Sequence, residues 1–192
     1  MRVFVVTPPD PVVSLEEAKE HLRVDGPDED DLIRSYIAAA TGHIDGPDGW
    51  LGRAIGLQTL EARFSLLLPA ACSGQAIRLP FGPVSALAAV SYLDSQGVEQ
   101  EADLNDFALY GDEVEPVASV YPWEGGSMQR EAGRIQYRAG YETLPPAIHA
   151  AILLMVGDLY ANRETASVGT GAAAIPMSAT PALLLGPFRV FT

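Results

Sequence analysis

A long apolar segment near the end of the chain limits the possible folds more than any other feature. Residues 145–163 read PPAIHAAILLMVGDLYANR, with no Asp, Glu, Lys or Arg before Asp158. This pattern predicts a helix that is apolar around almost its whole circumference, and such a helix must be covered on several sides. The segment therefore predicts either a helix packed at the centre of the fold or one covered in part by a neighbouring subunit.

Two shorter helices are predicted at the front of the chain. Ser14 is a favourable N-cap, and Glu17 completes a Ser-x-x-Glu capping box, which predicts a helix over about 14–24. Apolar residues recur at helical spacing over 29–44, so a second helix is expected there. An Asp-Gly-Pro-Asp tetrapeptide follows each helix, and glycine followed by proline ends helices.

The middle of the chain changes to a period of two, which is typical of half-buried strands. Strands are predicted at 58–66, 76–79, 84–93, 106–110, 117–121 and 133–139. Together they form a β-rich insertion over about 57–140. The expected fold class is therefore α+β: a mainly helical core of about three to four helices, an inserted small antiparallel β region and a mobile C-terminal tail.

The composition changes again after Arg163. Residues 165–181 are rich in Ala, Ser, Thr, Gly and Pro, which predicts a flexible linker. We therefore divide the chain into one domain over 1–164 and a tail over 165–192. The tail ends in a short apolar segment that is costly to leave in water, so it either folds back on its own core or docks on a neighbouring subunit or partner. The candidate interface residues are Leu183, Leu184, Leu185, Pro187, Phe188 and Phe191.

The sequence lacks the common catalytic and metal-binding motifs. It contains no GxxxxGK, GxSxG or HExxH pattern, and the single cysteine, Cys72, rules out an internal disulfide or a paired-cysteine zinc site. His21, His43 and His149 are spaced as helix-face or core residues. The acidic run at 28–31 lacks the spacing of a calcium loop, and its place at a helix start explains it. We predict no catalytic residue, no metal site and no cofactor.

The chain is strongly acidic. Its formal net charge is −13, from 25 acidic and 12 basic residues, which argues against binding of a phosphate backbone by a basic surface. The acidity either keeps the protein soluble or lets nucleic acid pass the surface without adhering. No charged leader and no membrane-length apolar run occur, so neither export nor a membrane span is expected.

Several short segments follow one another in a characteristic order. They are VSLEEAKEHLRVD at 13–25, DDLI at 30–33, YIAAA at 36–40, RAI at 53–55, QT at 58–59, LP at 79–80, PV at 83–84, VSYLD at 90–94, IQYRAGY at 135–141, PPAI at 145–148, AILL at 151–154 and LYANRE at 159–164. In this order they resemble the head-tail connector (adaptor) proteins of long-tailed bacteriophages and phage-like gene transfer agents. The resemblance covers about residues 12–164 and the leucine-rich terminal segment, and the 117–131 stretch fits it least well.

The resemblance implies a structural virion protein rather than an enzyme. Its implied partners are further copies of the chain in a dodecameric ring, the portal protein above the ring, and a neck, stopper or tail-terminator protein below it. DNA would pass through the channel of the ring without specific binding, and no membrane would be involved. The protein would be located at the head-tail junction of the particle, after assembly in the cytoplasm of the bacterial host.

Two other functions stay open from the residues alone. One is a small hydrolase or nucleotide-modifying enzyme with its catalytic group in the β-rich insertion, for which a carboxylate-lined pocket would be the discriminating observation. The other is a regulatory scaffold that binds a host protein through the tail. The sequence leaves open which surface would meet the portal, the oligomeric state of the free protein, and whether the source is a phage, a prophage or a gene transfer agent.

Overall fold

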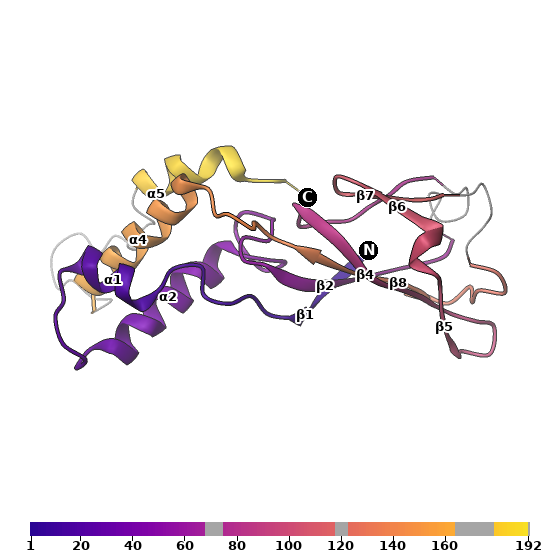
Figure 1. Cartoon of the computed structure of the whole chain (residues 1–192), viewed down its shortest axis with the longest axis horizontal. Helices are drawn as coiled ribbons and strands as arrows, with labels where there is room; N and C mark the ends of the chain where they lie inside the picture. The colour runs from indigo at the N-terminus through magenta and orange to yellow at the C-terminus, as the bar shows by residue number, and fades with distance from the viewer. Residues whose placement is uncertain (68–74, 118–122, 164–178, 192) are drawn as a thin grey trace, which may run out of the picture. The chain divides into compact units, whose positions relative to one another are not determined.

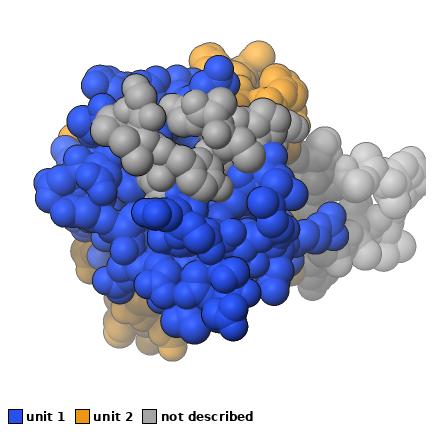
Figure 2. Space-filling view, turned by 90° about the vertical axis from the view of Figure 1, so that its right-hand side faces the viewer, with its two compact units in different colours: residues 1–10, 53–142, 192 blue, residues 11–52, 143–191 orange. Residues whose placement is uncertain are grey.

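The computed structural model describes residues 1–67, 75–117, 123–163 and 179–191 (Figure 1). The chain forms two compact units, which are described separately. The β unit comprises residues 1–10 and 53–142, and the helical unit comprises residues 11–52 and 143–191 (Figure 2). Each unit is therefore built from segments that are far apart in the sequence.

A five-stranded antiparallel sheet forms the main body of the β unit. Its order is β1 (Arg2–Thr7), β2 (Gln58–Phe64), β8 (Gly133–Ala139), β4 (Val84–Leu93) and β5 (Glu99–Glu101). Along β8 the burial alternates residue by residue, with Ile135 and Tyr137 fully buried. This alternation is the period of two that the sequence shows, and it gives the sheet one core face.

A second, three-stranded antiparallel sheet shares this core. It comprises β3 (Ile77–Arg78), β7 (Glu113–Pro116) and β6 (Phe107–Tyr110), and the short helix η1 (Leu104–Asp106) precedes β6. Apolar side chains of both sheets form one buried cluster. Trp123 lies inside it, with its ring centroid 5.7 Å from that of Phe64 and 5.9 Å from that of Tyr92. This edge-to-face packing shows that Trp123 is a core residue.

The helical unit contains α1 (Leu15–Leu22), α2 (Asp30–Ile44), α4 (Pro146–Ala161), α5 (Ala179–Leu185) and the short helix η2 (Gly186–Phe188). The predicted capping box at the start of α1 is present. The Glu17 amide donates to Ser14 Oγ at 3.2 Å, and the Ser14 amide donates to the Glu17 carboxylate at 2.8 Å. The N-terminus of α1 is thereby satisfied by two adjacent side chains.

The apolar helix α4 packs against three other helices of its unit, α1, α2 and α5. Five of its residues are buried: Ile148, Ala151, Ile152, Met155 and Val156. Of the two expectations, packing at the centre of the fold and cover by a neighbouring subunit, the first therefore accounts for the buried face of α4. Leu159 is the one large apolar residue of α4 that is exposed.

The predicted α+β class is confirmed, but a mainly helical core is not. In the described residues, eight strands in two sheets stand beside four helices, so the β region is no small insertion. Three strands escape prediction: β1 carries a run of four apolar residues without alternation, β5 is a short polar strand, and β7 alternates over only four residues. The short helix α5 was also not expected.

Some predictions fall on residues outside the described ranges. These are Cys72, most of the 117–121 strand and most of the 165–181 linker. The division into a domain over 1–164 and a tail over 165–192 likewise stays a prediction.

Candidate interface site

The C-terminal segment 179–191 places apolar side chains on both sides of a short helix. Helix α5 packs against α4, and its residues Pro181 and Leu185 are buried. Leu183 lies between them in the sequence and is 77% exposed. The helix therefore turns one face into its own unit and leaves one large apolar side chain in water.

The end of the chain is held by a turn near residue 50. The Val190 amide donates to the Leu51 carbonyl at 2.8 Å. Gly52 follows with φ +63°, and a Cβ at this position would lie 2.6 Å from the Val190 carbonyl oxygen. A residue other than glycine would thus be strained and would also press on the bound backbone. The absence of a side chain at Gly52 therefore allows the backbone at Val190 to lie close to this turn.

Arg189 adds a second attachment. Its guanidinium carbon lies 4.3 Å from the Trp50 ring centroid and 4.7 Å from that of Phe191. Cation–π contacts of this kind contribute about 0.5–1 kcal/mol at exposed sites. Phe191 itself is 82% exposed. The segment is therefore fixed in place while its terminal aromatic side chain stays accessible.

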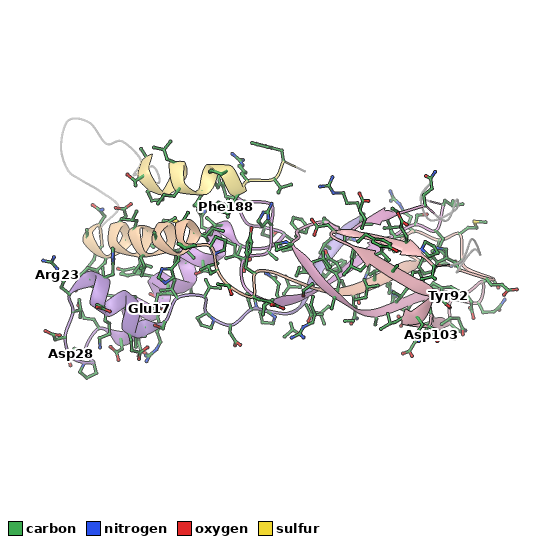
Figure 3. All side chains as sticks on the ribbon, turned by 45° about the horizontal axis from the view of Figure 1, so that its top comes forward. Glu17, Arg23, Asp28, Tyr92, Asp103 and Phe188 are labelled. Carbon is green, nitrogen blue, oxygen red and sulfur yellow. The ribbon has the colours of Figure 1, made fainter. Side chains whose placement is uncertain are left out.

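The six candidate interface residues fall into three groups. Leu185 is buried, Leu184 and Phe188 are half-buried, and Leu183, Pro187 and Phe191 are exposed. Figure 3 shows Phe188 just after α5. The tail thus folds back on its own helices and still presents apolar groups to solvent. Leu185 is covered within its own chain; the interface role of the six residues stays a prediction.

Sequence reasoning missed the residues that hold this segment: Trp50, Gly52 and Arg189. Trp50 and Arg189 lie far apart in the sequence, and no local pattern connects them. The glycine at position 52 was the only available sequence signal, and it does not indicate which distant segment packs against the turn.

Ion pairs account for most of the acidic run at 28–31. The Glu29 carboxylate accepts from the Tyr160 hydroxyl and, at 2.6 Å, from Arg163 Nη2. The hydrogen bond from Tyr160 contributes most, and together with that from Arg163 it lowers the pKa of Glu29. The hydrogen bond to Glu29 in turn raises the pKa of Tyr160. Lys19 Nζ lies 2.5 Å from Asp30 Oδ1. The run therefore joins α2 to α1 and to the end of α4.

The histidines and acids form no metal site within the described ranges. His21, His43 and His149 lie on α1, α2 and α4, as expected. His149 Nε2 is 3.3 Å from a Glu17 carboxylate oxygen, which ties α4 to α1.

A carboxylate-lined pocket of about 540 Å³ lies on the helical unit beside α1. Its lining residues are Leu15, Glu16, Lys19, Glu20, Arg23, Val24, Asp25 and Asp30. The lining contains no Ser, Cys or His that could act as nucleophile with a base beside it. Its lysine, Lys19, already donates to the Gly26 carbonyl and to Asp30. The pocket is lined by carboxylates, but it lies on the helical unit and not in the β-rich region where the enzyme alternative places its catalytic group.

None of the helices in the described parts of the chain is both long enough and apolar enough to span a membrane.

Residues 12–103 match the family model described as "Phage gp6-like head-tail connector protein". The resemblance to head-tail connector proteins is confirmed. The match includes α1, α2 and the strands from β2 to β5, so both units of this connector-like chain contribute to it. No curated protein matches the chain significantly.

The whole connector-like chain also has the fold of chains in three solved particles, each time covering 100% of this chain and 97% of the other. For "Neck of empty GTA particle computed with C6 symmetry" the TM-score is 0.72 at 21% identity. For "Virion of native gene transfer agent (GTA) particle" it is 0.70 at 20%. For "Neck of native GTA particle computed with C12 symmetry" it is 0.66 at 20%. At these identities the likeness establishes a common fold.

Proposed function

We propose that this chain is the subunit of a structural head-tail connector, which joins the capsid to the tail in a phage or phage-like particle. The match of residues 12–103 to the connector family carries the proposal. The common fold with chains from gene transfer agent necks supports it. The protein then acts by assembly and not by catalysis.

The proposed assembly is a ring of copies of this chain under the portal, at the head-tail junction of the particle. The neck structures with the same fold were computed with C6 and C12 symmetry, which supports a ring with twelve subunits. The proposed partners are the portal protein on one side and a neck, stopper or tail-terminator protein on the other. A net charge of −13 suits a channel that DNA crosses without adhering.

The exposed apolar residues of the C-terminal segment are the proposed docking groups. Leu183 and Phe191 are both largely exposed, although α5, which carries Leu183, packs on α4, and the backbone beside Phe191 is held by the Leu51 and Trp50 contacts. A pre-ordered segment loses less conformational entropy on binding than a free one, so more of the apolar burial contributes to affinity. Docking therefore needs no rearrangement of α5.

Light scattering over a concentration series, with and without portal protein, tests the proposal. We expect a ring in solution or one that forms on the portal. The double variant Leu183→Ser, Phe191→Ser should remain folded by circular dichroism and lose this assembly. The matched control is Val98→Ser, which changes an exposed apolar residue of the β unit. A wild-type chain that stays monomeric and ignores the portal would overturn the proposal.

Point variants are preferable to removal of residues 181–192. Deletion would also remove Pro181 and Leu185, which are buried within the helical unit. A loss of assembly after deletion could then result from a loss of stability.

A further inference from the structure

One edge of the five-stranded sheet is formed by β1, whose register with β2 shifts between Val5 and Thr7. Among the described strands, β1 pairs with β2 alone. Its six residues, RVFVVT, contain no lysine or proline, which commonly protect edge strands. Val5 and Val6 are 46% and 47% exposed. By contrast, the opposite end of the sheet closes with β5, which is short and reads EQE.

A second free length of edge lies on β4, next to β5. Strand β5 pairs only with Ser91–Leu93 of β4. From Val84 to Ala89, the described part of the sheet provides β8 as the one partner of β4. Two bulges occur there, at Ser85 and Ala88, and both residues are small and exposed. Bulged residues are left out of the ladder with β8. The Val84 amide donates to Asp112 Oδ1 at 2.9 Å and the Ala102 amide donates to the Val90 carbonyl at 2.9 Å, so the length without a second strand partner is Ser85–Ala89.

The directions of these two edges are compatible. Each neighbouring pair from β1 through β2 and β8 to β4 is antiparallel. Strand β1 therefore runs opposite to β4. If a second copy continued the sheet in the same orientation, its β1 would lie antiparallel to Ser85–Ala89, in line with β5. Every pair in the extended sheet would then be antiparallel.

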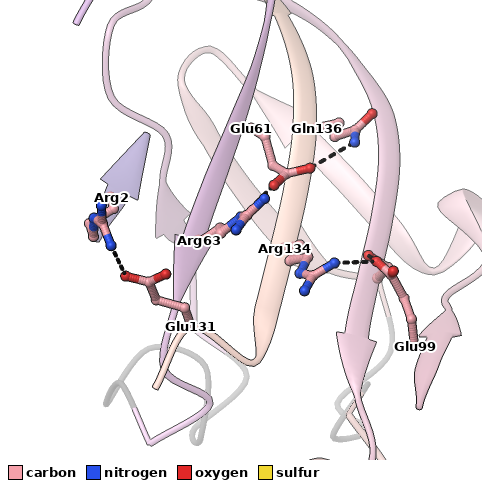
Figure 4. A network of polar contacts seen from close by, with 8 residues as sticks. Arg2, Glu61, Arg63, Glu99, Glu131, Arg134 and Gln136 are labelled. Carbon is pink, nitrogen blue, oxygen red and sulfur yellow. Dashed lines mark hydrogen bonds and ion pairs between the residues drawn. The ribbon is translucent and has the colours of Figure 1, made fainter. Parts of the chain in front are cut away.

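The charges at the two edges also match. The side chain of Arg2, at the start of β1, is 67% exposed, and its bond to Glu131 at 3.1 Å is a surface ion pair of small energy. Glu101 ends β5 opposite Ser91 and is exposed. In the continued sheet, Arg2 of the second copy would begin next to Glu101. Figure 4 shows Arg2 and the β5 residue Glu99 at opposite margins of the sheet.

We propose that β1 of one copy pairs with Ser85–Ala89 of the next copy, so that the sheets of neighbouring subunits form a continuous contact around the ring. The inference rests on the proposed ring and names the surface that closes it. Such a contact joins two different surfaces of the same chain, and repetition of a head-to-tail contact gives a ring where the rotation between neighbouring subunits closes. Main-chain hydrogen bonds supply the affinity, as in other cases of strand addition.

Cysteine cross-linking between single variants tests the pairing. In a Cys72→Ser background, Val5→Cys or Val6→Cys chains are assembled together with Ser85→Cys or Ala88→Cys chains and oxidised. We expect covalent dimers in at least one mixture and none in any variant alone, because a disulfide needs Cα atoms within about 7 Å. Dimers of Val5→Cys or Val6→Cys alone would indicate a symmetric β1–β1 contact and overturn the proposal, as would rings without any cross-link.

A lysine on the edge provides an independent test. Val5→Lys should raise the concentration at which rings form by at least about tenfold, which corresponds to about 1.4 kcal/mol, because a charge there opposes strand addition. The matched control Val98→Lys changes an exposed valine at the β4–β5 turn and should leave ring formation unchanged. Circular dichroism verifies that both variants fold.

The outcomes separate this inference from the proposed function. If the wild-type chain forms rings and Val5→Lys forms them equally well, the strand contact is wrong and the connector function stands. If the wild-type chain forms no ring with or without portal protein, both proposals fail.

Discussion

At the scale of single residues, Gly52 and Ser14 are two positions that control how the helical unit is completed. Gly52 has φ +63°, and a Cβ there would lie 2.6 Å from the Val190 carbonyl oxygen, whereas Gly97 has φ +79° with nothing within 4 Å of a Cβ. Both positions would strain an alanine, but only at Gly52 would the added methyl group also displace a neighbouring segment. A comparison of substitutions at Gly52 and Gly97 therefore distinguishes the effect of local backbone strain from the effect of displacing the C-terminal segment.

We predict that Gly52→Ala destabilises the chain more than Gly97→Ala. The strain common to both costs about 1 kcal/mol or more, and the clash with Val190 is additional. Hydrogen exchange of the Val190 amide should accelerate in Gly52→Ala and stay unchanged in Gly97→Ala. Equal exchange in both variants would show that the turn does not hold the terminal segment.

Ser14 is the second such position, because it caps α1. We expect Ser14→Ala to lower the free energy of unfolding by about 1 kcal/mol, since the Glu17 amide loses its acceptor. Ser95→Ala, at the β4–β5 turn, is the control and should change it by less than about 0.5 kcal/mol. Urea denaturation measures both. A Ser14→Ala midpoint equal to that of the wild type would contradict the capping role.

At the scale of elements, α5 has an inward and an outward face. Leu185 is fully buried, while Leu183, two residues earlier, is mostly exposed. The triple-leucine sequence alone does not distinguish them. Contact with α4 decides which leucine contributes to stability and which is available to a partner.

We therefore predict opposite effects for two leucine substitutions. Leu185→Ala should cost about 2–5 kcal/mol of stability, as is usual for a buried leucine, with a matching fall in the urea midpoint. Leu183→Ala should change stability by less than about 0.5 kcal/mol and weaken assembly in light scattering. If both variants unfolded at the wild-type midpoint, α5 would not be packed on α4.

At the scale of the whole molecule, carboxylates link the stability of both units to pH. Hydrogen bonds from Tyr160 and then Arg163 lower the pKa of Glu29. In the β unit, burial alone would raise the pKa of Glu61, but hydrogen bonds from Gln136 and Arg63 outweigh it and lower the pKa (Figure 4). A carboxylate with a lowered pKa binds its proton less readily in the folded chain than in the unfolded one.

The free energy of unfolding should therefore decrease as the pH falls. Above the ordinary glutamate pKa of 4.5 the stabilisation is complete, and it is lost as the pH falls through the lower folded-state values. Urea midpoints should therefore decrease from pH 5 towards pH 3. Glu29→Gln should be less stable at neutral pH and show a shallower decrease. An unchanged slope in this variant would mean that the contact with Tyr160 and Arg163 does not titrate with folding.

Features that depend on residues close together in the sequence could be predicted from the sequence. The Ser14 cap, the α2 stripe and the alternation along β8 are set by residues a few positions apart, and all three are confirmed. The ordered short segments likewise sufficed for the connector resemblance, which the family match confirms.

Pairing partners that lie far apart in the chain were decided only by the tertiary structure. The apolar sequence of β1 suits either a buried strand or an edge, and its place beside β2 makes it an edge. In the same way, Leu183, Leu184 and Leu185 are chemically identical until α4 covers one of them. The sequence alone determined the local elements, because caps and periods act within one element, and its ordered short segments determined the resemblance to connector proteins. Exposure, and with it the candidate interface, was decided by which distant segment covers each side chain.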